Sequence, residues 1–116
     1  MIKLKKINAV TVTGGTYSTT IDIGGSIQKI AYIKDDFASG VDFTITDTDT
    51  TENIWTEADV NASKSVFPNI TKTGVTGSAL TGDKNIYQPV VCSRLTLAIT
   101  SGGDAKNGAF YVYVEK

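Results

Sequence analysis

A regular alternation of apolar and polar residues constrains the fold of this chain more than any other feature. It occupies residues 17–23, 41–46 and 95–100, and glycines or other turn-forming residues bound each segment. A period of two places one face of a β-strand in a core and the other face in solvent. Together with the last apolar segment, these strands predict one shared core. The residues expected inside it are Ile21, Ile23, Phe43, Ile45, Leu95, Leu97, Ile99, Phe110, Val112 and Val114.

Two further segments, residues 27–34 and 109–115, are apolar on both faces and predict strands that are covered on both sides. In the first segment, strict alternation assigns Ile27, Ala31 and Ile33 to one face and Ile30 and Tyr32 to the other.

The N-terminal run changes the phase of its apolar residues near residues 6–8. A phase change moves side chains from one face of a strand to the other, so it indicates a β-bulge or a break in the strand. The expectation is a bulge, or a loose arm at residues 1–6 joined to a strand at residues 9–13.

Composition agrees with an all-β fold, because the chain has seventeen threonines but only four leucines. Branched residues fit a pleated surface and lose rotamer freedom in helices. One short helix of one or two turns is conceivable at residues 56–63, where Thr56 precedes Asp59 at capping spacing. We therefore predict a single domain over residues 1–116, an antiparallel β-sandwich or jelly-roll-like barrel.

Residues 61–88 interrupt this regularity, since they are rich in glycine and polar residues with only scattered apolar ones. A structureless loop of this length is uncommon in a compact domain unless it has a function or contains a strand. The sequence predicts a short strand at residues 65–70 and a long excursion after it.

The chain lacks the residues that most catalytic and metal sites need. It has no histidine and a single cysteine, Cys92, which removes Ser-His and Cys-His dyads and the usual zinc ligands. Cys92 is interpreted as a small buried side chain, with a reactive thiol near Arg94 as the weaker alternative. Nothing in the sequence places two carboxylates in a cleft. We expect no enzymatic activity, no cofactor and no metal.

Asp47, Asp49 and Glu52 are the one cluster of acidic residues that deserves weighing as an ion site. Oxygen-rich loops bind calcium, but this segment lacks the third aspartate and the glycine of an EF-hand loop. The sequence favours a solvated turn between two strands, with calcium binding as the alternative.

Charge and hydropathy argue against nucleic acid or membrane partners. The net charge is −1, and the basic residues are dispersed apart from Lys3, Lys5 and Lys6. No stretch approaches the roughly 20 apolar residues of a membrane helix, and the N-terminus lacks the apolar run of a secretory signal. Synthesis in the cytoplasm is expected.

Aromatic residues give the one indication of a binding surface. Trp55 lies opposite Ile54 along its strand, and Tyr111 and Tyr113 alternate with the apolar residues of the last strand. Such side chains either close a second core layer or form an aromatic patch for a partner subunit or a sugar ring.

Several segments resemble a group of short proteins from tailed-phage structural gene clusters. The resemblance lies in FASGVDFTITD at residues 37–47 with IWT at residues 54–56, in YSTTIDIGG at residues 17–25, and in GGDAKNG and YVYVE near the C-terminus. It implies a virion structural protein, such as a head decoration or other accessory protein. It also implies as partners a major capsid or other virion protein and further copies of the chain, a trimer being possible.

The leading hypothesis is therefore an auxiliary structural subunit of a phage particle, made in the host cytoplasm. The alternative is a sugar- or receptor-binding module of a tail fibre or adhesin. Residues 1–6 and 61–88 are expected to make contacts between subunits or with the lattice, because a neighbour would supply the burial that they lack. The anchors expected for such contacts are Phe67, Leu80, Tyr87, Tyr111 and Tyr113.

Overall fold

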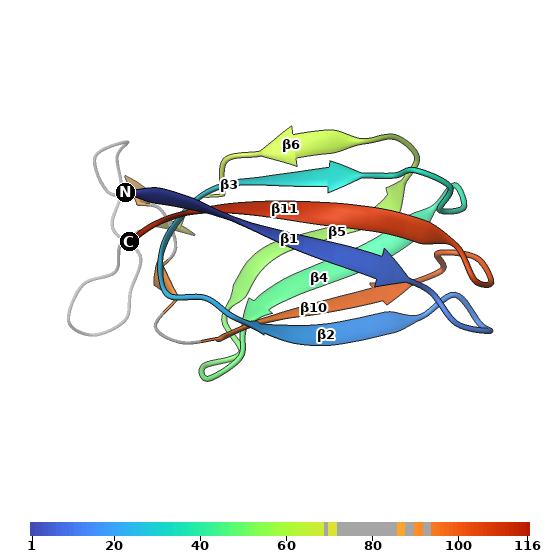
Figure 1. Cartoon of the computed structure of the whole chain (residues 1–116), viewed down its shortest axis with the longest axis horizontal. Coiled ribbons are helices and arrows are strands. Elements are labelled where there is room, and N and C mark those ends of the chain that lie inside the picture. Colours follow the sequence, from blue (N-terminus) through green and yellow to red (C-terminus); the bar gives the residue numbers. More distant parts are fainter. Residues whose placement is uncertain (69, 72–85, 88–89, 92–93) are drawn as a thin grey trace.

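The structure, a computed structural model, describes residues 1–68, 70–71, 86–87, 90–91 and 94–116 (Figure 1). Within these residues the chain forms strands and no helix, which confirms the all-β class. No described element is a helix long and apolar enough to cross a membrane. The strands are β1 (Ile2–Val10), β2 (Tyr17–Asp22), β3 (Gly25–Ile33), β4 (Val41–Asp47), β5 (Asn53–Val60), β6 (Lys64–Val66), β7 (Ile70–Thr71), β8 (Ile86–Tyr87), β9 (Val90–Val91), β10 (Arg94–Thr100) and β11 (Asn107–Glu115).

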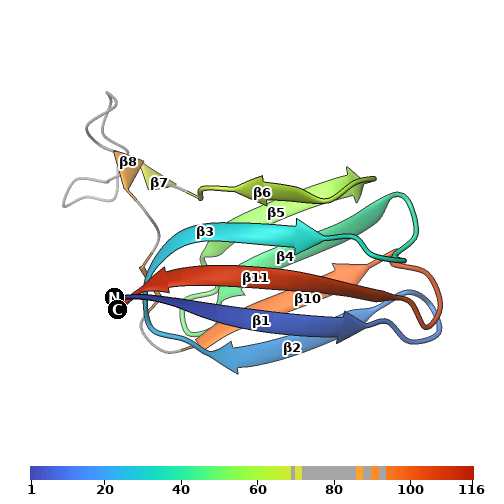
Figure 2. The same cartoon turned by 45° about the horizontal axis from the view of Figure 1, so that its top comes forward.

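Two antiparallel sheets pack face to face, as Figures 1 and 2 show. The larger sheet has the order β1-β11-β3-β6, with β9 also paired to β3, and the smaller sheet has the order β2-β10-β4-β5. Apart from the β4–β5 hairpin, which stays within the smaller sheet, consecutive strands among β1 to β6, β10 and β11 alternate between the two sheets, as in a jelly roll. The β-sandwich prediction is confirmed.

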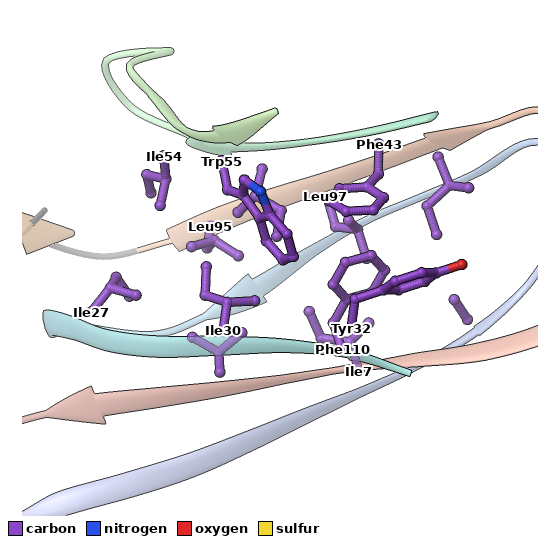
Figure 3. Packing of buried hydrophobic residues seen from close by; sticks show 14 of the residues in the cluster. Ile7, Ile27, Ile30, Tyr32, Phe43, Ile54, Trp55, Leu95, Leu97 and Phe110 are labelled. Carbon is purple, nitrogen blue, oxygen red and sulfur yellow. The ribbon is translucent and has the colours of Figure 1, made fainter. Parts of the chain in front are cut away.

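The core between the sheets contains the residues that alternation assigned to it. Nine of those ten residues are buried, and Ile21 packs against the core from its margin. An aromatic cluster lies at the centre (Figure 3). In it, the ring of Phe43 meets those of Trp55 and Phe110 edge-on, at centroid distances of 4.7 and 5.0 Å. Trp55 is therefore a core residue rather than part of a surface patch.

Bulges explain where strict alternation fails. Ile54 and Trp55 are both buried because the register of β5 on β4 shifts at this point, so that Ile54 is an extra residue in the strand. In β3 the register shifts at Gln28. Ile27 and Ile30 consequently both point into the core (Figure 3). The assignment of Ile27 to the opposite face from Ile30 was wrong for this reason.

The N-terminal run is a regular strand, which corrects the expected bulge or loose arm at residues 1–6. β1 pairs with β11 without a shift from Ile2, opposite Glu115, to Val10, opposite Asn107. The sequence changes phase because Ile2 and Leu4 are on the outward face whereas Ile7 is on the inward face. The apolar face of the strand changes, and the backbone continues unbroken.

The one candidate helix in the sequence, at residues 56–63, does not form, since β5 continues to Val60. Asp59 adopts a left-handed conformation with φ of 57°, and its N–H donates to the carboxylate of Asp42 at 2.9 Å. The capping-like spacing thus belongs to a second bulge. The strand predicted at residues 65–70 is two strands, β6 and β7.

Candidate interaction face

The outward side of the larger sheet collects apolar and aromatic side chains from all of its long strands. Alternate residues of β1, β3 and β11 point away from the core, and Phe67 follows directly after β6. We call this surface the aromatic face. Its members are Ile2, Leu4, Lys6, Lys29, Ile33, Phe67, Tyr111 and Tyr113.

The register of the strands arranges the aromatic face in two rows. Leu4 lies opposite Tyr113, which lies opposite Lys29 on its other side. The ammonium group of Lys29 is 5.2 Å from the ring centroid of Tyr113 and 5.9 Å from that of Phe67. The Lys29 ammonium group therefore lies near the rings of both Tyr113 and Phe67.

The second row begins with Lys6, whose ammonium group is 5.3 Å from the ring centroid of Tyr111, its partner across the strands. Tyr111 in turn lies opposite Ala31. Each ring is thus held beside a cation on a paired backbone, and such rings lose little conformational freedom when a partner covers them.

Exposed apolar area is unusually concentrated on this face. The exposed fractions are 57% for Ile2, 52% for Leu4 and 70% for Phe67. Single exposed apolar residues are ordinary on protein surfaces, but several on one face indicate an interaction site.

A shallow hollow of about 380 Å³ opens at one end of the aromatic face. Its lining includes Lys6 and Tyr111 and the polar residues Asn8, Asp35 and Asn107. Gly108 also lines it. A side chain at that position would collide with the ring of Phe37 beneath it.

The structure brings together three of the five predicted anchors. Phe67, Tyr111 and Tyr113 all belong to the aromatic face. Leu80 lies outside the described residues. Only the backbone of Tyr87 is described, in β8 opposite Ile70.

Sequence reasoning missed Leu4, Lys6 and Lys29 as members of this surface. The signal was present in the alternation of Ile2 and Leu4, but residues 1–6 were interpreted as an arm. Without a paired strand, no sequence feature connects Lys29 with Tyr113.

The outward side of the smaller sheet has a different character, because threonines from neighbouring strands cover it. Thr20, Thr96 and Thr46 lie side by side on β2, β10 and β4. The hydroxyl of Thr96 is 3.3 Å from that of Thr20 and 2.6 Å from that of Thr48. These hydroxyls bond to one another and present no apolar surface comparable to the aromatic face.

The acidic segment forms the turn between β4 and β5, as predicted, but Asp47 is buried rather than solvated. The carboxylate of Asp47 accepts the N–H of Asp49 at 3.0 Å, and the carboxylate of Asp49 pairs with Arg94 at 3.2 Å. In the part of the chain that the structure describes, no three His, Cys, Asp or Glu side chains gather closely enough to hold a metal ion.

Among the described residues, the two groups with shifted pKa values lie away from the aromatic face. Hydrogen bonding to Lys64 lowers the pKa of Glu57, and a hydrogen bond from the Trp55 indole lowers it further against the opposing effect of burial. Burial raises the pKa of Tyr32 to about 12. The Tyr32 hydroxyl is buried and has no hydrogen-bond partner among the described residues.

Comparisons with known proteins identify no family for this chain. No family model matches the chain, and no curated protein matches it. One similar solved structure is infectious bursal disease virus strain Gx, with 18% identity and a TM-score of 0.34, covering 97% of this chain and 32% of that chain.

Another is the VP2 subviral particle of infectious bursal disease virus, with 17% identity and a TM-score of 0.33, covering 99% of this chain and 32% of that chain. This chain therefore spans about a third of either matched chain. Because both TM-scores are low, the matches carry no argument about what this chain does.

Proposed function

We propose that this protein is a non-enzymatic structural subunit of a tailed-phage particle, a capsid decoration or accessory head protein. It docks on a repeated protein lattice through the aromatic face, and it is made in the host cytoplasm and resides in the virion. The observation that carries this proposal is the set of exposed apolar and aromatic side chains on a rigid, paired sheet.

The physical case rests on what such a face does in water. Leaving Leu4 and Phe67 exposed forgoes about 25 cal/mol for each Å² of apolar area that burial would remove from solvent. Interface centres are enriched in tyrosine and phenylalanine, as here around Tyr111 and Tyr113. A protein partner that covers this face regains that free energy and needs little ordering of the rings.

Fold and sequence resemblance narrow the class of partner. Jelly-roll sheets occur in viral capsid and lectin domains, which supports a particle protein by analogy of fold alone. The resemblance of residues 37–47 and 54–56 to short proteins of tailed-phage structural gene clusters favours the virion over a lectin.

The test compares two apolar-to-threonine changes on the aromatic face with one elsewhere. The double variant Leu4→Thr with Phe67→Thr is expected to weaken binding to particles that lack this protein by about tenfold or more. Val12→Thr is a single-site control for the loss of an exposed apolar side chain outside the aromatic face, because Val12 is 60% exposed and lies in the β1–β2 connection. Cosedimentation gives the affinities, and electron microscopy shows whether bound copies follow the lattice. Equal loss in both variants would contradict a role for the aromatic face.

A receptor-binding module is the second candidate, and the hollow beside Tyr111 favours it. A tyrosine surrounded by Asn8, Asp35 and Asn107 offers stacking and hydrogen bonds of the kind that a sugar ring uses. In this case Asn107→Ala weakens binding to host-surface glycans, and copies lie only at the tail tip. The leading proposal expects neither result.

A further inference from the structure

The two sheets have four edges among the described residues. β1 forms one edge of the larger sheet, β6 and the two-residue β9 form its other edge, and β2 and β5 form the edges of the smaller sheet. An edge strand exposes unpaired N–H and C=O groups that can pair with another chain, and proteins block this with lysines, bulges or very short strands. Three of the four edges carry such features.

β1 places Lys3 and Lys5 on its inward side, in line with the buried Ile7. β6 has only three residues and includes Lys64. β5 contains two bulges and the left-handed residue Asp59. Each feature prevents a straight strand from adding beside the edge.

β2 has none of these features. It pairs with β10 in unbroken register from Asp22, opposite Arg94, to Tyr17, opposite Ile99. It contains no lysine and no proline, and its one charged residue is Asp22 at its end. Within the described part of the chain, its other side carries no strand.

The core also thins towards β2. Tyr17 and Ile21 are only partly buried and pack against the core cluster from its margin, whereas Leu97 and Ile99 on the neighbouring β10 are fully buried. A hollow of about 450 Å³ at the first residues of β2 is lined by Val12 and Tyr17 and by Ile99 of β10. Because Tyr17 and Ile21 are only partly buried, the inward side of this edge retains apolar surface for a further strand to cover.

We propose that β2 pairs antiparallel with β2 of a second copy, across a two-fold axis at Thr19. Residues directly opposite in an antiparallel pair share a face, so the register must place inward residues opposite inward residues. With Thr19 opposite its own counterpart, Tyr17 lies opposite Ile21 of the second copy, and Ser18 lies opposite Thr20. This register matches the two half-buried apolar residues and sets no like charges against each other.

The resulting dimer joins two smaller sheets into one continuous sheet and is closed, as isologous contacts are. Both aromatic faces stay free, because they belong to the other sheet of each copy. A dimer that binds a lattice through two faces gains avidity. The inference goes beyond the proposed function, since pairing between copies is measured without any particle.

Introducing a charge at Thr19, on the two-fold axis, tests this pairing. Thr19→Lys and Thr19→Glu each place two like charges directly opposite in the dimer, and each is expected to raise its dissociation constant by about tenfold or more. An equimolar mixture of the two variants places lysine opposite glutamate and is expected to restore dimers. Thr56→Lys is the matched control, because Thr56 is an exposed residue on β5, the opposite edge of the same sheet.

Sedimentation equilibrium of the full chain over about 1–100 µM gives the oligomeric state, and thermal melting shows whether each variant is folded. A wild-type protein that is monomeric throughout, or that forms trimers, overturns the inference. So does a dimer that neither Thr19 variant weakens, or a mixture of folded variants that stays monomeric. Loss of particle binding by the Leu4 and Phe67 variant, with self-association unchanged, bears only on the proposed function.

Discussion

The sandwich has two open sides, where edge strands of the two sheets approach each other, and the structure closes them differently (Figure 2). Between β5 and β6, the carboxylate of Glu57 accepts the Trp55 indole N–H at 3.0 Å and a bond from Lys64 at 2.9 Å. Between β1 and β2, one long bond of 3.4 Å joins the Tyr17 hydroxyl to the carbonyl of Asn8.

The two sides differ in how completely their own side chains cover the core, and this difference indicates where a partner could bind. The β5–β6 side is sealed by a buried aromatic ring, an ion pair and two bulges. The β1–β2 side retains half-buried apolar residues beside a straight edge. The β5–β6 side is closed by contacts within the subunit, and the β1–β2 side is where we propose that β2 of a second copy pairs.

The largest expected effect comes from opening the sealed side. Trp55→Ala is expected to lower the free energy of unfolding by about 3–5 kcal/mol, because a buried ring is lost and a cavity remains. Tyr17→Ala on the other side is expected to cost only about 1–2 kcal/mol, since part of its ring is already in water. Urea denaturation at low protein concentration measures both. Equal losses would remove the contrast between the two sides.

A second prediction concerns the hydroxyl of Tyr32 in the core between the two sides and whether water reaches it. The Tyr32 hydroxyl is buried and meets no hydrogen-bond partner in the part of the chain that the structure describes, so Tyr32→Phe is expected to stabilise the fold by roughly 1 kcal/mol at neutral pH.

The same residue gives an alkaline signature. Burial raises the folded pKa of Tyr32 to about 12, above the ordinary value of 10.0. The hydroxyl therefore does not make the free energy of unfolding depend on pH below pH 10.0, but it lowers that free energy as the pH rises from 10.0 towards 12. The Tyr32→Phe variant should lack this part of the alkaline loss. Unfolding curves at neutral pH and above pH 10 measure it, and identical pH profiles would mean that the hydroxyl is hydrated.

The smallest effect concerns the ion pair of the sealed side. Glu57→Gln is expected to cost about 1 kcal/mol at neutral pH, because the exposed part of the pair is screened by solvent. The folded pKa is lowered, so this stability is present above the ordinary carboxyl pKa of 4.5 and is lost as the pH falls through the folded pKa. Denaturation curves of wild type and variant should therefore converge in acid, and a gap that persists there contradicts an ionic cause.

The sequence predicted the fold well where strands are regular. The alternation of Leu95, Leu97 and Ile99 needs no knowledge of neighbours, because period two alone selects the inward side. Ile27 and Ile54 were assigned poorly or ambiguously because a bulge depends on the strand opposite, which periodicity does not contain. Whether one or both faces of a strand are buried likewise depends on what packs against its sheet, so it cannot be read from the strand alone.

The candidate site was predictable only in fragments. The alternation of Tyr111 and Tyr113 with apolar residues predicted that both point away from the core. Lys6 and Phe67 lie on the same face only because distant segments of the chain pair in the sheet, which the sequence does not reveal. Lys3 and Lys5 suggested an arm because inward-pointing lysines break an apolar pattern, although they lie on a regular edge strand.

The pairing of β1 with β11 has a consequence for biosynthesis. Among the described strands β1 has no other partner, and Ile2 pairs with Glu115 near the opposite end of the sequence. Such long-range pairing forms slowly. During synthesis, β1 therefore cannot pair with β11 until β11 has emerged from the ribosome. Until then, β1 carries the positive charges of Lys3, Lys5 and Lys6. They act as gatekeeper residues, which suppress the aggregation of exposed apolar segments.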